Sequence, residues 1–377
     1  MMHSALDDYQ DVQEDFMIPE SKKEAVARAL WEAFGVTEYE DIRMLTAGLS
    51  SALVFRIVVR GCPYLLRLVV STGVAAGPGQ GDPTRQFACM KSAAEMGLAP
   101  RVWYTSIEDK ISITDFVTAR PLSRTEALVR LPAAIQALHA LPPFPSVVNY
   151  LDAVDGFVRR FQDAKILPES ETEELLRQYA RVASVYPRHD AEMVSSHNDL
   201  KPENILFDED RVWLVDWEAA FLNDRYLDLA VVANFIVTDD AEEEAYLRRY
   251  FGEEAGEYRL ARFYLMRQIT HMSYAMVFML LGSGGKAVES NIAPLDFRDF
   301  HDRIWAGEVS LVTNEARLQY GRVHMNQALH NMRAARFEDA LRIVSDRHAR
   351  AACRADASDA FFHAVDVAWS ACIYEFD

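Results

Sequence analysis

The hydrophobic positions of residues 42–117 form short runs rich in β-branched and aromatic side chains, which is typical of strands. The runs cover residues 51–59, 64–70, 102–104 and 111–117. One helical pattern, from Thr84 to Met96, interrupts them and ends at Gly97, a common helix stop. Another amphipathic helix precedes them, from Ser21 to Phe34. The pattern predicts an antiparallel sheet with the helix from Thr84 to Met96 packed on it.

After Pro121 the hydrophobic period becomes helical. The predicted helices cover 125–141, 151–164, 170–186, 258–281, 315–345 and 358–377. Only one pair of strands is expected among them, Asn204 to Phe207 and Arg211 to Val215. A chain of 377 residues is too long for one ordinary core. We therefore expect an α+β fold with a small antiparallel-sheet N-lobe and a larger, mainly helical C-lobe.

The expected organisation has four parts. They are an N-terminal arm and helix (1–41), a nucleotide-binding sheet lobe (42–118), a helical lobe with the catalytic and metal motifs (119–314) and a helical extension (315–377). The purpose of that extension and the oligomeric state do not follow from the sequence.

The formal net charge is −18, and half of the residues are apolar. Nucleic acids and anionic membranes require a cationic surface, so neither is expected as the main partner. A small cationic partner suits this charge, although the charge also serves solubility. The first residues are acidic where a signal peptide would be cationic, and no apolar run reaches membrane-spanning length. A cytoplasmic location is expected.

Two segments carry the candidate chemistry, His197 to Asn204 and Val215 to Glu218. Phosphoryl transfer requires a carboxylate that orients the attacking hydroxyl, a divalent metal and fixed cations. Asp199 lies in a loop before a strand, Asn204 follows five positions later, and Asp216 lies at the end of the next strand. The alternative is a surface loop with ordinary capping acids. The order of these residues favours phosphotransfer.

Residues 197–206 and 215–235 resemble the catalytic loop and metal motif of the aminoglycoside phosphotransferase and choline kinase superfamily, which has a protein-kinase-like fold. Asp216-Trp217-Glu218 and the segment 223–228 are most similar to choline and ethanolamine kinases. The resemblance implies ATP as donor, Asp199 as base and Mg²⁺ held by Asn204 and Asp216. Lys201 matches the catalytic-loop lysine of Ser/Thr protein kinases, and this match implies that it steadies the transferred phosphoryl group; the alternative is a solvated lysine.

Three flanking residues are given supporting roles. We expect His197 to support the catalytic loop, Asp228 to hold that loop through backbone N–H groups, and Arg225 to pair with a nearby carboxylate.

The nucleotide site is placed by the same resemblance. Its predicted residues are Gly48, Ser50 and Ser51 in a phosphate loop, Arg67 on the third strand, and Asp115, Phe116 and Val117 in the adenine hinge. Arg67 stands where protein kinases have lysine, and a guanidinium also binds phosphate oxygens. The family normally holds this cation with a glutamate, but Gln86 occupies that position. Glu95, a loop acid or the nucleotide itself is expected to replace it.

The acceptor site is less strongly marked. A quaternary ammonium group needs aromatic faces and carboxylates around it. Tyr274 matches one of the two tryptophans that choline kinases carry on this helix, and Val277 replaces the other. Glu218 and Trp305 are further candidates for contact with the acceptor. The alternatives are an ordinary core stripe for the aromatic residues, and a second metal or a salt bridge for Glu218.

The leading hypothesis is therefore an ATP-dependent small-molecule kinase with a choline- or ethanolamine-like acceptor. Aminoglycosides and thiamine remain open as acceptors. A protein kinase is disfavoured because Asp216-Trp217-Glu218 replaces Asp-Phe-Gly. A nucleotide-binding pseudokinase scaffold is the alternative from another class.

Overall fold

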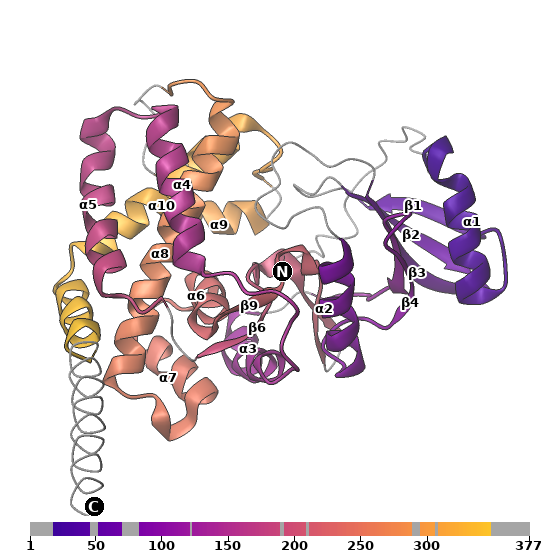
Figure 1. Ribbon diagram of the computed structural model, residues 1–377, viewed down its shortest axis with the longest axis horizontal. Helices are drawn as coiled ribbons and strands as arrows, with labels where there is room; N and C mark the ends of the chain where they lie inside the picture. The colour runs from indigo at the N-terminus through magenta and orange to yellow at the C-terminus, as the bar shows by residue number, and fades with distance from the viewer. Residues whose placement is uncertain are drawn as a thin grey trace, which may run out of the picture.

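The protein is described by a computed structural model over residues 18–45, 52–69, 83–120, 123–188, 192–208, 211–288, 295–305 and 308–347. It has two lobes that follow one another along the long axis of the molecule (Figure 1). The smaller lobe is built on an antiparallel sheet, and the larger is mainly helical. The predicted α+β class is confirmed. None of the described helices is long and apolar enough to span a bilayer.

The N-lobe sheet has the strand order β1-β2-β3-β5-β4. The strands are β1 (Asp41–Leu45), β2 (Ala52–Val59), β3 (Cys62–Val69), β4 (Val102–Ser106) and β5 (Ile111–Asp115). Alternate residues of β2, including Phe55 and Ile57, are buried in one cluster with α1 (Glu20–Phe34). This is the period of two that a half-buried strand requires. The central strand β3 carries Arg67, which pairs in register with Ser112 of β5.

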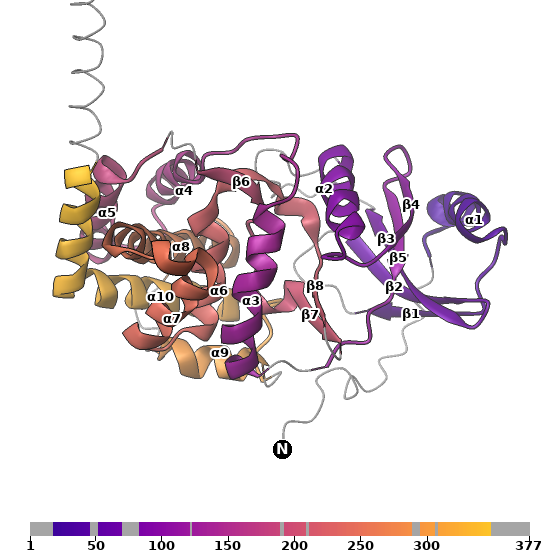
Figure 2. The same ribbon diagram turned by 90° about the horizontal axis from the view of Figure 1, so that it is seen from below.

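Helix α2 (Pro83–Glu95) differs from the expected arrangement. It contacts β4, but its buried side chains Phe87, Met90 and Ala93 belong to the same apolar cluster as the C-lobe. Figure 2 shows α2 between the sheet and the larger lobe. Helix α1 covers the sheet. The predicted contact of α2 with the sheet is present at β4, but the buried apolar face of α2 packs on the C-lobe core.

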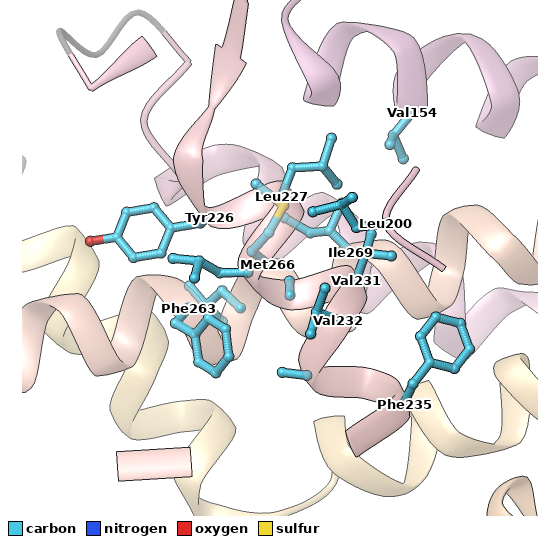
Figure 3. Close-up of a cluster of buried hydrophobic side chains, with 14 of the residues drawn as sticks. Val154, Leu200, Tyr226, Leu227, Val231, Val232, Phe235, Phe263, Met266 and Ile269 are labelled. Carbon is cyan, nitrogen blue, oxygen red and sulfur yellow. The ribbon is translucent and has the colours of Figure 1, made fainter. Parts of the chain in front are cut away.

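The C-lobe is built around α6 and α8. Its helices are α3 (Arg124–His139), α4 (Tyr150–Ala164), α5 (Glu169–Val185), α6 (Arg225–Ile236), α7 (Asp240–Phe251), α8 (Glu257–Ser283), α9 (Phe297–Trp305) and α10 (Asn314–Met332). Every residue of α6 after Arg225 is buried. Figure 3 shows side chains of α6 and α8 packed together, with Leu200 of the candidate catalytic loop among them. This packing holds the loop on the core.

Two strand pairs lie in the C-lobe. The predicted hairpin is present as β7 (Ile205–Asp208) and β8 (Arg211–Leu214). A second antiparallel pair joins β6 (Met193–Ser196) to β9 (Phe221–Asp224), so the expectation of a single pair is wrong. These strands are four residues long and have little hydrophobic alternation, so their pattern carries no strand signal.

The prediction of one continuous helix from Glu315 to Ser345 is also wrong. Helix α10 ends at Met332, and a separate helical segment covers 335–347. Tyr264 of α8 donates a hydrogen bond to the Asn331 carbonyl at 2.8 Å, which occupies a helix-end acceptor. The break lets Phe337 pack into the main core. The predicted helix from Ser358 lies outside the described residues.

Candidate active site

The loop between β6 and β7 presents the Asp199 carboxylate. Lys201 Nζ donates to Asp199 Oδ2 at 2.9 Å, and Asn204 Nδ2 donates to the same oxygen at 3.0 Å. The short 3₁₀ helix η1 (Pro202–Asn204) turns Asn204 back so that it also donates to the Asp199 carbonyl at 2.7 Å. Leu200 is buried beside them. The orientation of the carboxylate is thus set by two donors and by a buried neighbour.

Asp228 of α6 holds this loop through hydrogen bonds. Its carboxylate accepts hydrogen bonds from the backbone N–H groups of His197 at 2.9 Å and Asn198 at 2.7 Å, and from the Ser196 hydroxyl at 2.7 Å. Burial alone would raise the pKa of Asp228, but the hydrogen bond with His139 and the neighbouring groups lower it overall. Asn198 has a left-handed backbone with φ of 66°, which asparagine tolerates better than most residues. The expected role of Asp228 is confirmed.

The catalytic loop is joined directly to the second motif. His197 Nε2 lies 2.9 Å from the Val215 carbonyl, and its ring packs against Trp217 with centroids 4.8 Å apart. Asn198 Nδ2 donates to the Ala219 carbonyl at 2.8 Å. His197 therefore has the supporting position that the sequence predicts, and hydrogen bonds connect the two motifs directly.

Asp216 lies directly before the 3₁₀ helix η2 (Trp217–Ala219), in a left-handed conformation with φ of 65°. Its Oδ1 atom is buried and has no hydrogen-bond partner among the described residues. The described residues contain no group of three or more His, Cys, Asp or Glu side chains placed to hold a metal. Mg²⁺ bound with nucleotide takes only one or two protein ligands beside phosphate and water, so Asp216 and the Asn204 amide oxygen fit such an ion.

Arg67 reaches this motif from the N-lobe. Its guanidinium forms an ion pair with Glu218 and lies 3.6 Å from Asp216 Oδ1. Burial lowers the pKa of Arg67, and the charge of Asp216 partly opposes this shift. Glu95 is exposed at the end of α2, so the acid that replaces the missing glutamate at Gln86 is Glu218. This pairing places Glu218 beside Arg67, which also lies next to Asp216.

Arg225 is also paired as predicted. Its Nε lies 4.0 Å from Glu192 Oε2.

Asp115, the first residue of the predicted hinge, forms hydrogen bonds within the N-lobe. The Asp115 N–H donates to the Arg101 carbonyl at 2.9 Å, and its carboxylate accepts from Trp103 Nε1 at 2.7 Å. Phe116 follows the strand, and its ring lies 5.5 Å from the Arg56 guanidinium. Val117 comes next along the segment that leads to the C-lobe. The Asp115 N–H group and carboxylate are thus both bonded within the N-lobe.

Four predicted site residues have no described side-chain geometry. Gly48, Ser50 and Ser51 lie outside the described residues, and Trp305 ends α9 with its side chain outside them.

Aromatic side chains face Asp199 from the C-lobe. The Tyr274 hydroxyl lies 3.4 Å from Asp199 Oδ1, and Tyr320 of α10 packs edge-on against the Tyr274 ring. Burial and the Asp199 carboxylate raise the pKa of both Tyr274 and Tyr150. Burial, followed by the charges of Glu203 and Asp199, raises the pKa of Tyr320. Three phenols and two carboxylates therefore share one region.

Sequence reasoning found Tyr274 but missed Tyr150, Tyr320 and Glu203 as site residues. Glu203 belongs to η1, in the same loop as Asp199. Tyr150 and Tyr320 belong to α4 and α10, and no sequence spacing relates these helices to that loop. Helix packing brings the two tyrosines to it.

A two-lobe fold with this sheet, loop and metal motif defines a kinase-type phosphotransferase of small molecules. A family model described as APH, phosphotransferase enzyme family, matches residues 41–264, more than half of the chain. The chain therefore belongs to that phosphotransferase family, as the sequence resemblance predicts.

Solved structures with this fold include a choline/ethanolamine kinase family protein from Mesorhizobium loti. It aligns with a TM-score of 0.61 at 20% identity over 85% of this chain and 98% of the other. Choline kinase LicA from Streptococcus pneumoniae aligns with a TM-score of 0.55 at 15% identity over 83% and 99%. Spectinomycin phosphotransferase in complex with ADP and spectinomycin aligns with a TM-score of 0.51 at 13% identity over 85% and 97%.

The sequence similarity to a curated relative is local. Protein LicA of Haemophilus influenzae is 50% identical over 36 residues, which are 10% of this chain and only 14% of LicA.

Proposed function

We propose that the enzyme transfers the γ-phosphoryl group of ATP, as its Mg²⁺ complex, to the hydroxyl of a small organic cation of the choline and ethanolamine class. The observation that carries this proposal is the position of Asp199. One of its oxygens is fixed by Lys201 and Asn204, and the other faces the aromatic residues Tyr274 and Tyr320.

The donor side of the site carries two cations. Arg67 lies beside Asp216 and Lys201 beside Asp199, and both cations can meet phosphate oxygens. Mg²⁺ held by Asn204 and Asp216 would neutralise charge on the phosphates as it develops. We assign the phosphate loop to Gly48, Ser50 and Ser51, and contact with the adenine to the hinge that begins at Asp115.

The acceptor side is anionic and aromatic. Asp199 and Glu203 both act on the buried Tyr274 and Tyr320, so their negative charge extends over this region. Aromatic faces and carboxylates together replace the hydration shell of an ammonium group. The net charge of −18 favours the approach of a cation. A choline- or ethanolamine-like substrate with its hydroxyl at Asp199 would place its nitrogen, three bonds from the hydroxyl oxygen, against these rings.

The reaction uses Asp199 for orientation and proton transfer. The acceptor hydroxyl oxygen attacks the γ-phosphorus, the bond from that phosphorus to the β–γ bridging oxygen breaks, and ADP leaves. Asp199 accepts the hydroxyl proton as the oxygen attacks. Lys201 stays beside the carboxylate and the incoming phosphoryl group.

An ADP-release assay with paired acceptors tests the proposal. We expect choline or ethanolamine to support turnover and 3,3-dimethylbutan-1-ol, the neutral isostere of choline, to react about 5–30-fold less efficiently, because one cation–π site supplies about 1–2 kcal/mol. Thiamine and a set of aminoglycosides complete the panel.

Other outcomes identify the alternatives. Equal turnover of choline and its neutral isostere would refute the cationic acceptor site. A higher catalytic efficiency with an aminoglycoside than with choline or ethanolamine would identify the enzyme as an aminoglycoside kinase. Mg²⁺-dependent nucleotide binding without ADP release for any acceptor would favour the pseudokinase scaffold.

A further inference from the structure

The turn after Asp216 is held at three successive carbonyls by side chains from distant elements. Asn198 of the catalytic loop donates to the Ala219 carbonyl. Arg85 of α2 donates to the carbonyls on either side, Nη2 to Glu218 at 2.7 Å and Nη1 to Ala220. The catalytic loop and the N-lobe helix therefore hold the same short turn between them.

Arg85 is suited to this contact by its position and shape. Only 8% of its surface is exposed, and its guanidinium lies 5.1 Å from the Phe221 ring. Cys89, one helical turn further along α2, also directs its thiol to the Ala220 carbonyl at 3.8 Å. The planar guanidinium presents two donors in a fixed geometry, which a lysine ammonium cannot reproduce. The contact thus depends on arginine and not on positive charge alone.

The rest of α2 supports the same coupling. Its apolar residues Phe87, Met90 and Ala93 are buried in the C-lobe core. Arg67, by contrast, takes its carboxylate partner from the turn itself, through Glu218. The turn is therefore the point where α2, the central strand and the catalytic loop meet.

We propose that Arg85 is a positioning residue for the metal-binding turn, which it fixes through the Glu218 and Ala220 carbonyls so that Asp216 keeps its left-handed conformation. This rests on the proposed function only for the assignment of Mg²⁺ to Asp216. In related kinases a glutamate at the position of Gln86 holds the cation that corresponds to Arg67. Here Glu218 pairs with Arg67, and Arg85 of the same helix holds the turn that carries Glu218.

The test compares Arg85→Met and Arg85→Lys with the matched control Arg298→Met. Arg298 also donates to two backbone carbonyls, those of Phe235 and Val237, but in the C-lobe away from the turn. For each variant, ADP binding is measured by calorimetry with Mg²⁺ and with EDTA. Amide hydrogen exchange of residues 216–221 is measured without nucleotide.

We expect Arg85→Met to bind Mg·ADP about tenfold more weakly, since the turn that carries Asp216 loses two hydrogen bonds from a charged donor. Its binding of metal-free ADP should change less than twofold, and residues 216–221 should exchange faster than in the wild type. Arg85→Lys should recover little of the loss. Arg298→Met should leave both measurements at wild-type values.

Wild-type exchange at 216–221 in Arg85→Met would overturn the proposal, as would an equal loss of ADP affinity with Mg²⁺ and with EDTA. If the wild-type enzyme itself binds ADP equally well with and without Mg²⁺, the metal assignment of the proposed function fails. The exchange measurement then still decides the role of Arg85.

Discussion

Replacement of Gly321 by alanine should separate two helices that the acceptor side requires in contact. Gly321 lies on α10 where it crosses α8, and an added Cβ would lie 2.6 Å from Met279 Cγ, 2.9 Å from the Ala275 carbonyl and 3.1 Å from the Met279 amide nitrogen. The Met279 side chain can turn away. The backbone atoms of α8 cannot, so α10 has to move.

The magnitude follows from two opposing effects. Overpacking of this kind costs about 1–3 kcal/mol. Alanine in place of glycine inside a helix recovers about 0.5–1 kcal/mol. The free energy of unfolding of Gly321→Ala should therefore fall by roughly 1 kcal/mol, between limits of about 0 and 2.5 kcal/mol.

Gly156→Ala is the matched control. Gly156 lies inside α4, and the nearest atom to its added Cβ is Arg159 Nη2 at 4.0 Å. This variant gains helix propensity without a clash and should be stabilised by about 0.5–1 kcal/mol. Urea unfolding at fixed temperature, followed by circular dichroism, measures both changes.

The displacement should also reach the site, because Tyr320 is one residue from Gly321 and packs against Tyr274. We expect the KM of Gly321→Ala for the acceptor to rise and its KM for ATP to stay unchanged. A Gly321→Ala enzyme as stable as Gly156→Ala would refute the close helix crossing. If Gly321→Ala loses stability as predicted but keeps the wild-type KM for the acceptor, α10 has no role in the acceptor site.

Three further variants test individual residues. Asp199→Ala should lower kcat by about 10²–10⁴-fold in the ADP-release assay while ADP still binds, since a positioned base contributes that much, and a near-normal kcat would exclude Asp199 as base. Asp216→Ala should abolish the Mg²⁺ dependence of ADP affinity in calorimetry, and retained dependence would show that the metal lies elsewhere. Asp228→Asn tests a dependence on pH. The pKa of Asp228 is lower in the folded state than in the unfolded state, where it is about 3.9, so the charged carboxylate stabilises the fold above that pH. This stabilisation is lost as the pH falls from about 3.9 through the pKa of the folded state. Urea unfolding should therefore show the largest loss for Asp228→Asn at neutral pH and a smaller difference from wild type below about pH 4; a difference that does not depend on pH would contradict the shift.

The family and the local chemistry could be predicted from the sequence because the residues concerned lie close together along the chain. Asp199, Lys201 and Asn204 occupy one loop, so one hydrogen-bonded turn is enough to gather them. The strands of the N-lobe sheet were predictable for a similar reason, since alternation in β2 and β3 reflects one buried and one open face. Local pattern and local geometry coincide in these segments.

Other features were decided by the tertiary structure alone. The pairing of β6 with β9 depends on main-chain hydrogen bonds between short polar segments, which leave no hydrophobic period. The replacement of the missing helix acid by Glu218 depends on how η2 meets β3, 151 residues apart in the chain.

The acceptor side shows the same division most clearly. Tyr150, Tyr274 and Tyr320 belong to three helices, and no spacing in the sequence relates them to Asp199. Tyr274 and Tyr320 meet because α8 and α10 approach closely at Gly282 and Gly321, where an added Cβ has no room. Tyr150 joins them because α4 also packs against α8. The sequence by itself therefore determined the reaction, because its chemistry is local, whereas helix packing over long separations determined what surrounds the acceptor.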